Sequence, residues 1–428
     1  MRRFVRIVLL VSPLLITGFG IANEARATAN SAAGVTPVPA RAQNWPAGLD
    51  DIQTTSGDIY LGNLDARIDA LAAANRRNAR ADLQVSQAGA LYHRYRIRGK
   101  LADAEHALGL LDAALAQSPR NAEALALRAT VLAGFHRFTA AAADLDAVAS
   151  ANPAKAGALA EARREISLAT GRYDLLREDF SRSTDPQGGF YEIAFRGNLL
   201  LQKGDLAGAS AQFRRAQALF TDSSPMPLAW LHVQQGIALL RHGRHADAAL
   251  FFKAAHDRLP GFTLATEHLA ETQTQLRSFA VARELYARVI ADTGSPEFIG
   301  ALAGLERDAG NASLAARLDA RASEGWSRLV AKYPAAFAQH AIGFYLDRGE
   351  PARALALAQQ NSKLRQDVGS YILLALAAEA AGSRAEACAA RQLAMGSGLQ
   401  PPEMEDLASL ATSCPAVFAS RLPEPLQH

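Results

Sequence analysis

The sequence predicts an all-α protein built as a solenoid of repeated helix-turn-helix units. Hydrophobic residues make up 49% of the 428 residues but aromatic residues only 7%, so the apolar side chains are mainly Ala and Leu. Both residues favour helices, and the small Ala side chain lets two helices pack closely. A short pattern of turn, apolar and small residues also recurs at intervals of about 34 residues, which is typical of an array of helical repeats.

The N-terminus has the features of a secretory signal peptide. Three arginines precede an apolar stretch over residues 7–22, and an Ala-Thr-Ala triplet of small residues ends at Ala29. We therefore expect residues 1–29 to be removed, leaving a periplasmic or secreted protein. An uncleaved anchor is the alternative, but the stretch contains Pro13 and is shorter than the roughly 20 apolar residues that a spanning helix needs. No second long apolar run follows, so no membrane span is expected in the mature chain.

The composition changes after the expected cleavage site. Residues 30–57 are rich in Ala, Ser, Thr, Pro and Gly, a mixture that buries too little apolar surface to fold, so they predict a flexible lead. Apolar residues then occur at helical spacing, which predicts a capping helix within residues 58–83.

The repeat itself consists of a turn residue, an apolar residue two positions later and, usually, an Ala three positions further on. Gly suits the turn because it adopts positive φ at little cost. Ala suits the point where two helices cross, because a larger side chain would push the backbones apart. The nine turn residues are Gly99, His136, Gly171, Gly204, Gly243, Arg277, Gly310, Gly349 and Gly382. The residues predicted to form the core of the units include Ala141, Gly197, Ala209, Phe213, Gly236, Ala248, Phe252 and Ala282.

This pattern resembles the tetratricopeptide repeat (TPR), whose signature combines a small residue in the first helix, Ala and an aromatic residue in the second, and a closing Pro. Residues 84–294 match well, and residues 295–400 match as degenerate units, where Asp319, Ala358 and Arg391 replace bulky apolar residues. Residues 401–428 are expected to form a short helix and a tail. The resemblance implies a right-handed α-α superhelix.

The resemblance also implies a function, because the first helices of such units line a concave groove that binds a peptide or helical segment of a partner. We expect the partner to be another protein or peptide. The residues at the family's groove positions that we select are Tyr191, Asn198, Trp230, Ile237, Arg241, Glu267 and Glu271. Alternatively, Trp230 and Ile237 fill the core between repeats.

Charge and motifs argue against other functions. The 45 basic and 42 acidic residues are interspersed and sum to +3, so no concentrated basic face for nucleic acid is expected. The sequence contains no Gly-x-Ser-x-Gly, His-Glu-x-x-His or glycine-rich phosphate loop. We therefore expect no catalytic residues, no enzymatic activity and no cofactor. A structural subunit of a cell-envelope assembly, self-associating through the edges of its repeats, remains an alternative.

Two smaller groups of residues leave alternatives open. His232, His242 and His245 are close enough in the sequence to suggest a Zn²⁺ site, although structural or solvated histidines are the more ordinary interpretation, so no metal is expected. Cys388 and Cys414 are the only cysteines. They could form a disulfide in an oxidising compartment or remain two buried apolar side chains.

Overall fold

The computed structural model of the chain describes residues 49, 51–153 and 157–414. The expected signal peptide, most of the expected flexible lead and the tail after residue 414 lie outside the described residues.

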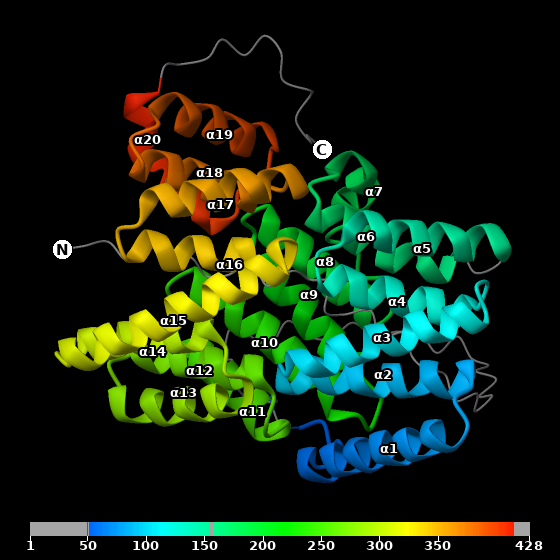
Figure 1. Cartoon of the computed structure of the whole chain (residues 1–428). Coiled ribbons are helices and arrows are strands. Elements are labelled where there is room, and N and C mark those ends of the chain that lie inside the picture. The colour runs from blue at the N-terminus through cyan, green and yellow to red at the C-terminus, as the bar shows by residue number, and fades with distance from the viewer. Residues whose placement is uncertain (1–48, 50, 154–156, 415–428) are drawn as a thin grey trace.

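The helices follow one another in short steps along the chain (Figure 1). The α-helices of the first half are α1 (Gly57–Arg77), α2 (Ala81–Arg98), α3 (Leu101–Gln117), α4 (Ala122–Gly134), α5 (Phe138–Ala151), α6 (Ala160–Ala169), α7 (Arg177–Ser181), α8 (Phe190–Gln202), α9 (Leu206–Ala218) and α10 (Pro225–Arg241). Those of the second half are α11 (His245–Arg258), α12 (Thr263–Gln275), α13 (Phe279–Thr293), α14 (Pro296–Asp308), α15 (Ala312–Lys332), α16 (Pro334–Asp347), α17 (Pro351–Leu364), α18 (Val368–Ala380), α19 (Arg384–Gly396) and α20 (Ala408–Ser413). Short 3-10 helices are η3 (Gly157–Leu159), η4 (Tyr173–Leu176) and η5 (Pro402–Leu407).

Consecutive helices form pairs, and each pair packs against the next, from α2 with α3 through to α18 with α19. The described residues contain no β-strand. The predicted fold class, an all-α solenoid of helix-turn-helix units, is therefore confirmed.

All nine predicted turn residues have positive φ, between 53° and 85°. Seven are glycines, for which this conformation is easy. His136 and Arg277 adopt it as well, although residues with side chains rarely do. The turn therefore has the same backbone geometry in every unit, even where Gly is replaced.

In two units, α8 with α9 and α10 with α11, the helices cross where a glycine of the first meets an aromatic ring of the second. A Cβ atom on Gly197 would lie 2.5 Å from Cε1 of Phe213, and one on Gly236 would lie 2.5 Å from Cε1 of Phe252. Both rings are completely buried, as are the predicted core alanines Ala141, Ala209, Ala248 and Ala282. The two helix backbones can thus approach closely because glycine has no side chain at the crossing point.

The third unit departs from the pattern. Its second helix is replaced by η4 and the short α7, which ends at Ser181. Leu176 stands where most other units have Ala, and it is fully buried. A bulky side chain at the crossing point keeps the second element from lying along the first, which explains why this unit has no long second helix.

The C-terminal units replace part of the apolar contact with charge. Asp319, at a position where the repeat favours a bulky apolar residue, forms ion pairs with Arg307 and Arg348. The guanidinium of Arg348 lies 3.6 Å from the centre of the Phe344 ring, in cation–π geometry. These units still pack as helix pairs, because the ion pairs and the stacked arginine occupy the space of the missing side chain.

The solenoid coils back on itself, so that turns of early units contact the beginnings of late units. Figure 1 shows α16 to α18, in orange, beside helices of the first half. The connecting hydrogen bonds join His136 Nδ1 to Ala335 O (3.0 Å), Gln366 N to Thr170 O (3.3 Å) and Gln400 N to Gln202 O (2.9 Å). Successive turns of the superhelix are therefore in direct contact.

Helix α10 lies at the centre of this arrangement. All of its residues except Pro227 are buried. Its sequence is predominantly apolar on every side, as expected of a helix surrounded by protein. None of the described helices combines the length and the apolar character needed to cross a membrane.

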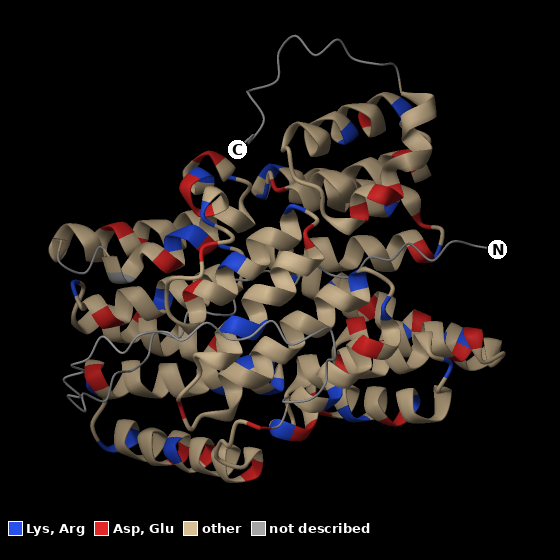
Figure 2. Ribbon diagram, turned by 180° about the vertical axis from the view of Figure 1, so that it is seen from behind, with Lys and Arg blue, Asp and Glu red and all other residues tan. Residues whose placement is uncertain are grey.

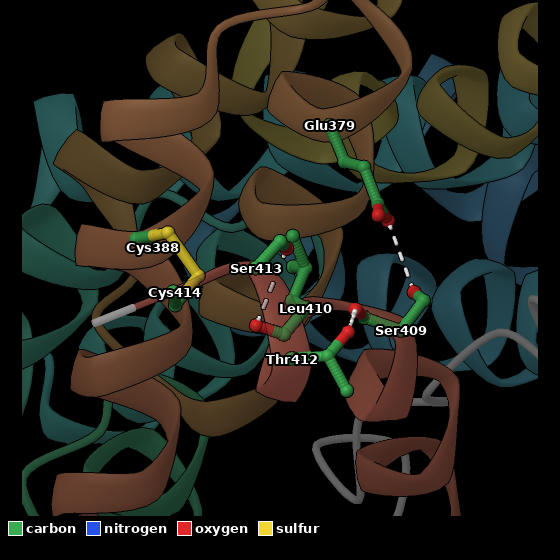
Figure 3. Close-up of a disulfide and its surroundings, with 7 residues drawn as sticks. All are labelled: Glu379, Cys388, Ser409, Leu410, Thr412, Ser413 and Cys414. Atoms are coloured by element: carbon green, nitrogen blue, oxygen red, sulfur yellow. Dashed lines mark hydrogen bonds between the residues drawn. A yellow bond between two sulfur atoms is a disulfide. The ribbon is translucent and has the colours of Figure 1, made fainter. Parts of the chain in front are cut away.

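A disulfide fastens the C-terminal end of the described chain. Cys388 of α19 and Cys414, directly after α20, are joined with an S–S distance of 2.04 Å (Figure 3). Nearby, the Ser409 hydroxyl donates to a Glu379 carboxylate oxygen at 3.4 Å. The last short helix is thus attached to the final helix pair by a covalent and a polar contact.

The glycine crossing can be tested by adding one methyl group. Gly236→Ala should lower the free energy of unfolding by about 1–3 kcal/mol, because the new Cβ overlaps the Phe252 ring. Gly109→Ala is the control: no atom lies within 4 Å of a Cβ at this exposed position of α3. There the substitution should raise stability by roughly 0.5–1 kcal/mol. Urea unfolding measures both, and equal stability of Gly236→Ala and wild type would contradict the tight crossing.

Candidate functional site on the first helices of the units

The predicted groove residues of α8 and α10 are not open to solvent. The exposed fractions of Trp230, Ile237 and Asn198 are 2%, 6% and 6%. For Trp230 and Ile237 this agrees with the alternative interpretation, in which they fill the core between repeats. The physical reason is the coiling of the superhelix, which leaves α10 surrounded rather than facing an open groove.

Arg241 also has a structural contact. Its Nε donates to Glu403 Oε1 at 2.6 Å, and both side chains are largely buried. Glu403 belongs to η5, so this ion pair connects α10 to the C-terminal cap. The guanidinium is therefore engaged within the chain and not presented on the surface.

Tyr191 is half-buried at the beginning of α8, in an environment of tyrosines and charged groups. Burial raises the pKa of Tyr191, and the nearby positive charge of Arg96 opposes this increase. The Phe190 ring packs edge-on against Tyr191, with centroids 4.9 Å apart. Of the predicted groove residues, Tyr191, Glu267 and Glu271 are those that keep partial exposure.

Buried hydrogen-bond donors without an acceptor occur along these helices. They include Asn198 Nδ2 on α8 and Trp230 Nε1, Gln234 Nε2 and Gln235 Nε2 on α10. Trp230, Gln234, Ile237 and Arg241 are spaced so that they lie along one side of α10. Since buried donors in proteins are nearly always paired, these N–H groups are places where buried water would be bound.

The predicted groove residues Glu267 and Glu271 of α12 converge on a histidine that the sequence analysis did not select. His268 Nδ1 lies 3.2 Å from Glu267 Oε2 and 3.1 Å from Glu271 Oε2. The three ligand atoms lie within 4.8 Å of one another, the only such group of three or more His, Cys, Asp or Glu in the described parts of the chain. The signal was present as Glu-His-x-x-Glu, in which the two glutamates are one helical turn apart.

The charges of this cluster influence one another strongly. Burial raises the pKa of Glu267 well above its usual range, and the neighbouring carboxylates Glu271 and Glu297 add to the increase. Burial lowers the pKa of His268, but the negative charges of Glu267 and Glu271 outweigh it and raise the pKa. The carboxyl groups of this cluster therefore lie close enough to influence one another, with the His268 imidazole as their common neighbour.

A second pair of glutamates has the same position in another unit. Glu161 and Glu165 of α6 precede Gly171 by ten and six residues, as Glu267 and Glu271 precede Arg277. Glu165 is 1% exposed, and neither of its carboxylate oxygens has a hydrogen-bond partner. Burial raises its pKa well above the usual range. Nothing in the sequence marked Glu165, because a glutamate in a helix is usually solvated.

The histidines suggested as an alternative metal site do not come together. His232 is fully buried, and neither ring nitrogen has a partner. The Nδ1 atom of His242 instead lies 2.7 Å from Ala238 O in its own helix. Neither they nor His245 belong to a group of potential ligand atoms among the described residues, so the proposed ligand set is corrected. The reason is that His232 points toward the Phe251 ring of α11, with centroids 6.3 Å apart.

Comparison with known proteins was made at the level of sequence and of structure. No family model matches the sequence. No curated protein matches it either. Among solved structures, a chain of the APC/C hetero-tetramer Cut9-Hcn1 is 14% identical with a TM-score of 0.44, covering 78% of this chain and 63% of that chain. Yeast Tom70 is 15% identical with a TM-score of 0.33, covering 83% and 93%. A tetratricopeptide repeat protein from Parabacteroides merdae is 12% identical with a TM-score of 0.33, covering 69% and 98%.

The fold type is identified from three features of this chain: paired helices, a positive-φ turn in each unit and, in two units, a glycine–aromatic crossing. The fold is of the TPR type. Solenoids of this kind contact partners through extended surfaces built from many units. Along the ribbon of this TPR-type solenoid, basic and acidic residues are interspersed (Figure 2).

Substitution of Arg241 tests whether this arginine stabilises the fold or is free to bind a partner. Arg241→Ala should lower the free energy of unfolding by about 3–5 kcal/mol, because it leaves Glu403 buried without its partner. Replacing both residues by Met should restore most of that loss, since two apolar side chains need no compensation. Urea unfolding and the rate of proteolysis of the C-terminal cap are the measurements. Wild-type stability of Arg241→Ala would mean that the guanidinium is free.

His232 should make stability depend on pH. Burial, assisted by the positive charge of Arg258, lowers the pKa of His232 to about 3. The unfolded chain binds a proton there below about pH 6.5, so folding loses stability as the pH falls toward 3. At pH 5 this loss is about 2 kcal/mol.

The variant His232→Leu removes the titrating group. Its loss of unfolding free energy between pH 7 and pH 5 should be smaller than that of wild type by about 2 kcal/mol. Urea unfolding at both pH values provides the comparison, and identical pH dependence of the two proteins would show that His232 accepts a proton in the folded state.

Proposed function

We propose that this protein is an interaction scaffold in the periplasm of a bacterium, where the first helices of its TPR-type units hold a peptide or helical segment of a partner. The observation behind the proposal is the continuous array of paired helices, because solenoids of this kind contact partners through extended surfaces built from many units. Apolar contact with the half-buried Tyr191 would add to the binding.

Export is part of the proposal. The basic N-terminal region, the apolar stretch and the Ala-Thr-Ala triplet support a signal peptide cleaved after Ala29. The disulfide between Cys388 and Cys414 supports the same conclusion, because such bonds persist in oxidising compartments. Osmotic-shock fractionation and N-terminal sequencing of the mature protein test it directly.

The binding site is tested at Tyr191, the predicted groove residue of α8 that keeps partial exposure. The variant Tyr191→Ala should remain folded, because this side chain is only half-buried at the beginning of its helix. It should lose a partner that wild type captures by cross-linking in the periplasm. Gln360→Leu is the control, since this exposed residue lies on α17, far along the chain from α8 and α10.

Three results are informative. Capture of one recurrent partner by wild type and the control, but not by Tyr191→Ala, would support the proposal. Equal capture by all three proteins would exclude the beginning of α8 as the binding site. Recovery of only further copies of this chain would favour the alternative function, a structural subunit that self-associates through its repeat edges.

A further inference from the structure

The cluster on α12 contains carboxyl groups that are not paired with any arginine or lysine among the described residues. Every other buried carboxylate with a partner is paired with an arginine: Asp103 with Arg94, Asp144 with Arg128, Glu306 with Arg283 and Asp367 with Arg365. Glu267, Glu271 and Glu297 have no arginine or lysine within ion-pair distance among the described residues, and their partners are the imidazoles of His268 and His340. A cation from outside the chain would complete this site.

The hydrogen bonds at His268 do not satisfy both neighbouring glutamates. The His268 side chain is 4% exposed, and its Nδ1 is directed toward two carboxylates at once. Only Glu271 is in hydrogen-bond geometry with Nδ1, and the Glu267 carboxylate forms no hydrogen bond within the described chain. Glu267 Oε2 lies 3.2 Å from Nδ1 without a hydrogen bond between the two atoms.

These distances suit ligands of one metal ion. Two ligand atoms of a tetrahedral Zn²⁺ site, each about 2.1 Å from the ion, stand roughly 3.4 Å from each other. The separations from His268 Nδ1 to the two carboxylate oxygens are 3.1 and 3.2 Å. The exposed fractions of the Glu267 and Glu271 side chains are 12% and 28%, so solvent can reach the carboxylate side of the cluster.

We propose that Glu267, His268 and Glu271 bind a divalent transition-metal ion, with Zn²⁺ as the best match. One imidazole nitrogen and two carboxylate oxygens are a ligand set that Zn²⁺ accepts, with a further position open to water or to another ligand. Ca²⁺ and Mg²⁺ prefer oxygen ligands alone and should bind much more weakly. Glu297 of α14 contributes negative charge beside the three ligands.

This site is independent of the proposed scaffold function, because it needs no partner protein. A bound ion would lock α12 in its present side-chain arrangement and neutralise the charge between α12 and α14. The role is therefore structural: it stabilises the middle of the solenoid.

The test uses the full mature chain, purified without a polyhistidine tag and treated with a chelator. Isothermal titration calorimetry with Zn²⁺ should show one equivalent bound, and calorimetric melting should show a higher Tm with Zn²⁺ than with Mg²⁺ or Ca²⁺. Glu271→Gln, which keeps the shape of the side chain, should weaken Zn²⁺ binding by at least about tenfold. His268→Gln should have the same effect.

The control is Glu284→Gln, an exposed glutamate on the neighbouring α13 that should leave binding unchanged. Circular dichroism verifies that each variant is folded. Failure of wild type to bind Zn²⁺ or to gain thermal stability from it would overturn the proposal. So would unchanged binding in both Glu271→Gln and His268→Gln, because the ion would then lie elsewhere on the chain.

Discussion

Contact between successive turns of the superhelix determines which surfaces this protein can offer. An array of helix pairs always curves, but here the turns of early units bind the first residues of late units through backbone and side-chain hydrogen bonds. The Arg241–Glu403 pair extends the same contact to the C-terminal cap. As a result, α10 is surrounded by protein and has the burial of a core helix, although its place in the repeat is that of a groove-lining helix.

Buried polar groups need a hydrogen-bond or ion-pair partner, and in this protein some of them have one and others do not. Buried carboxylates at several helix contacts each have an arginine, and Asp319 has two. The first helices α6 and α12 are different: Glu165 has no hydrogen-bond partner, and Glu267 and Glu271 share a single histidine. Unpaired donors at Asn198, Trp230 and Gln234 belong to the same layer of helices. Incomplete pairing is costly in the interior, so this layer is where a ligand or partner would contribute most.

The units themselves show how far the repeat tolerates variation. At the crossing of Gly236 and Phe252 a Cβ atom would overlap the ring. The third unit instead has Leu176 at this position, and its second helix is short. In the C-terminal units Asp319 forms ion pairs with two arginines beside an apolar core. Each unit contacts mainly its neighbours, so one irregular unit changes the local packing without ending the solenoid.

The sequence alone determined the local structure of this protein. Turn residues, small crossing residues and aromatic core residues act within one helix pair, so their spacing predicted the units, the turn positions and residues such as Phe213 and Phe252. The sequence also placed Tyr191, Glu267 and Glu271 on the first helices. Long-range contacts could not be predicted from the local sequence pattern. The pair of Arg241 and Glu403, for example, joins residues 162 positions apart. Only the tertiary structure decided that Trp230 and Ile237 are buried and that His268 lies between two glutamates, since these facts depend on how the turns of the superhelix stack and how neighbouring helices orient their side chains.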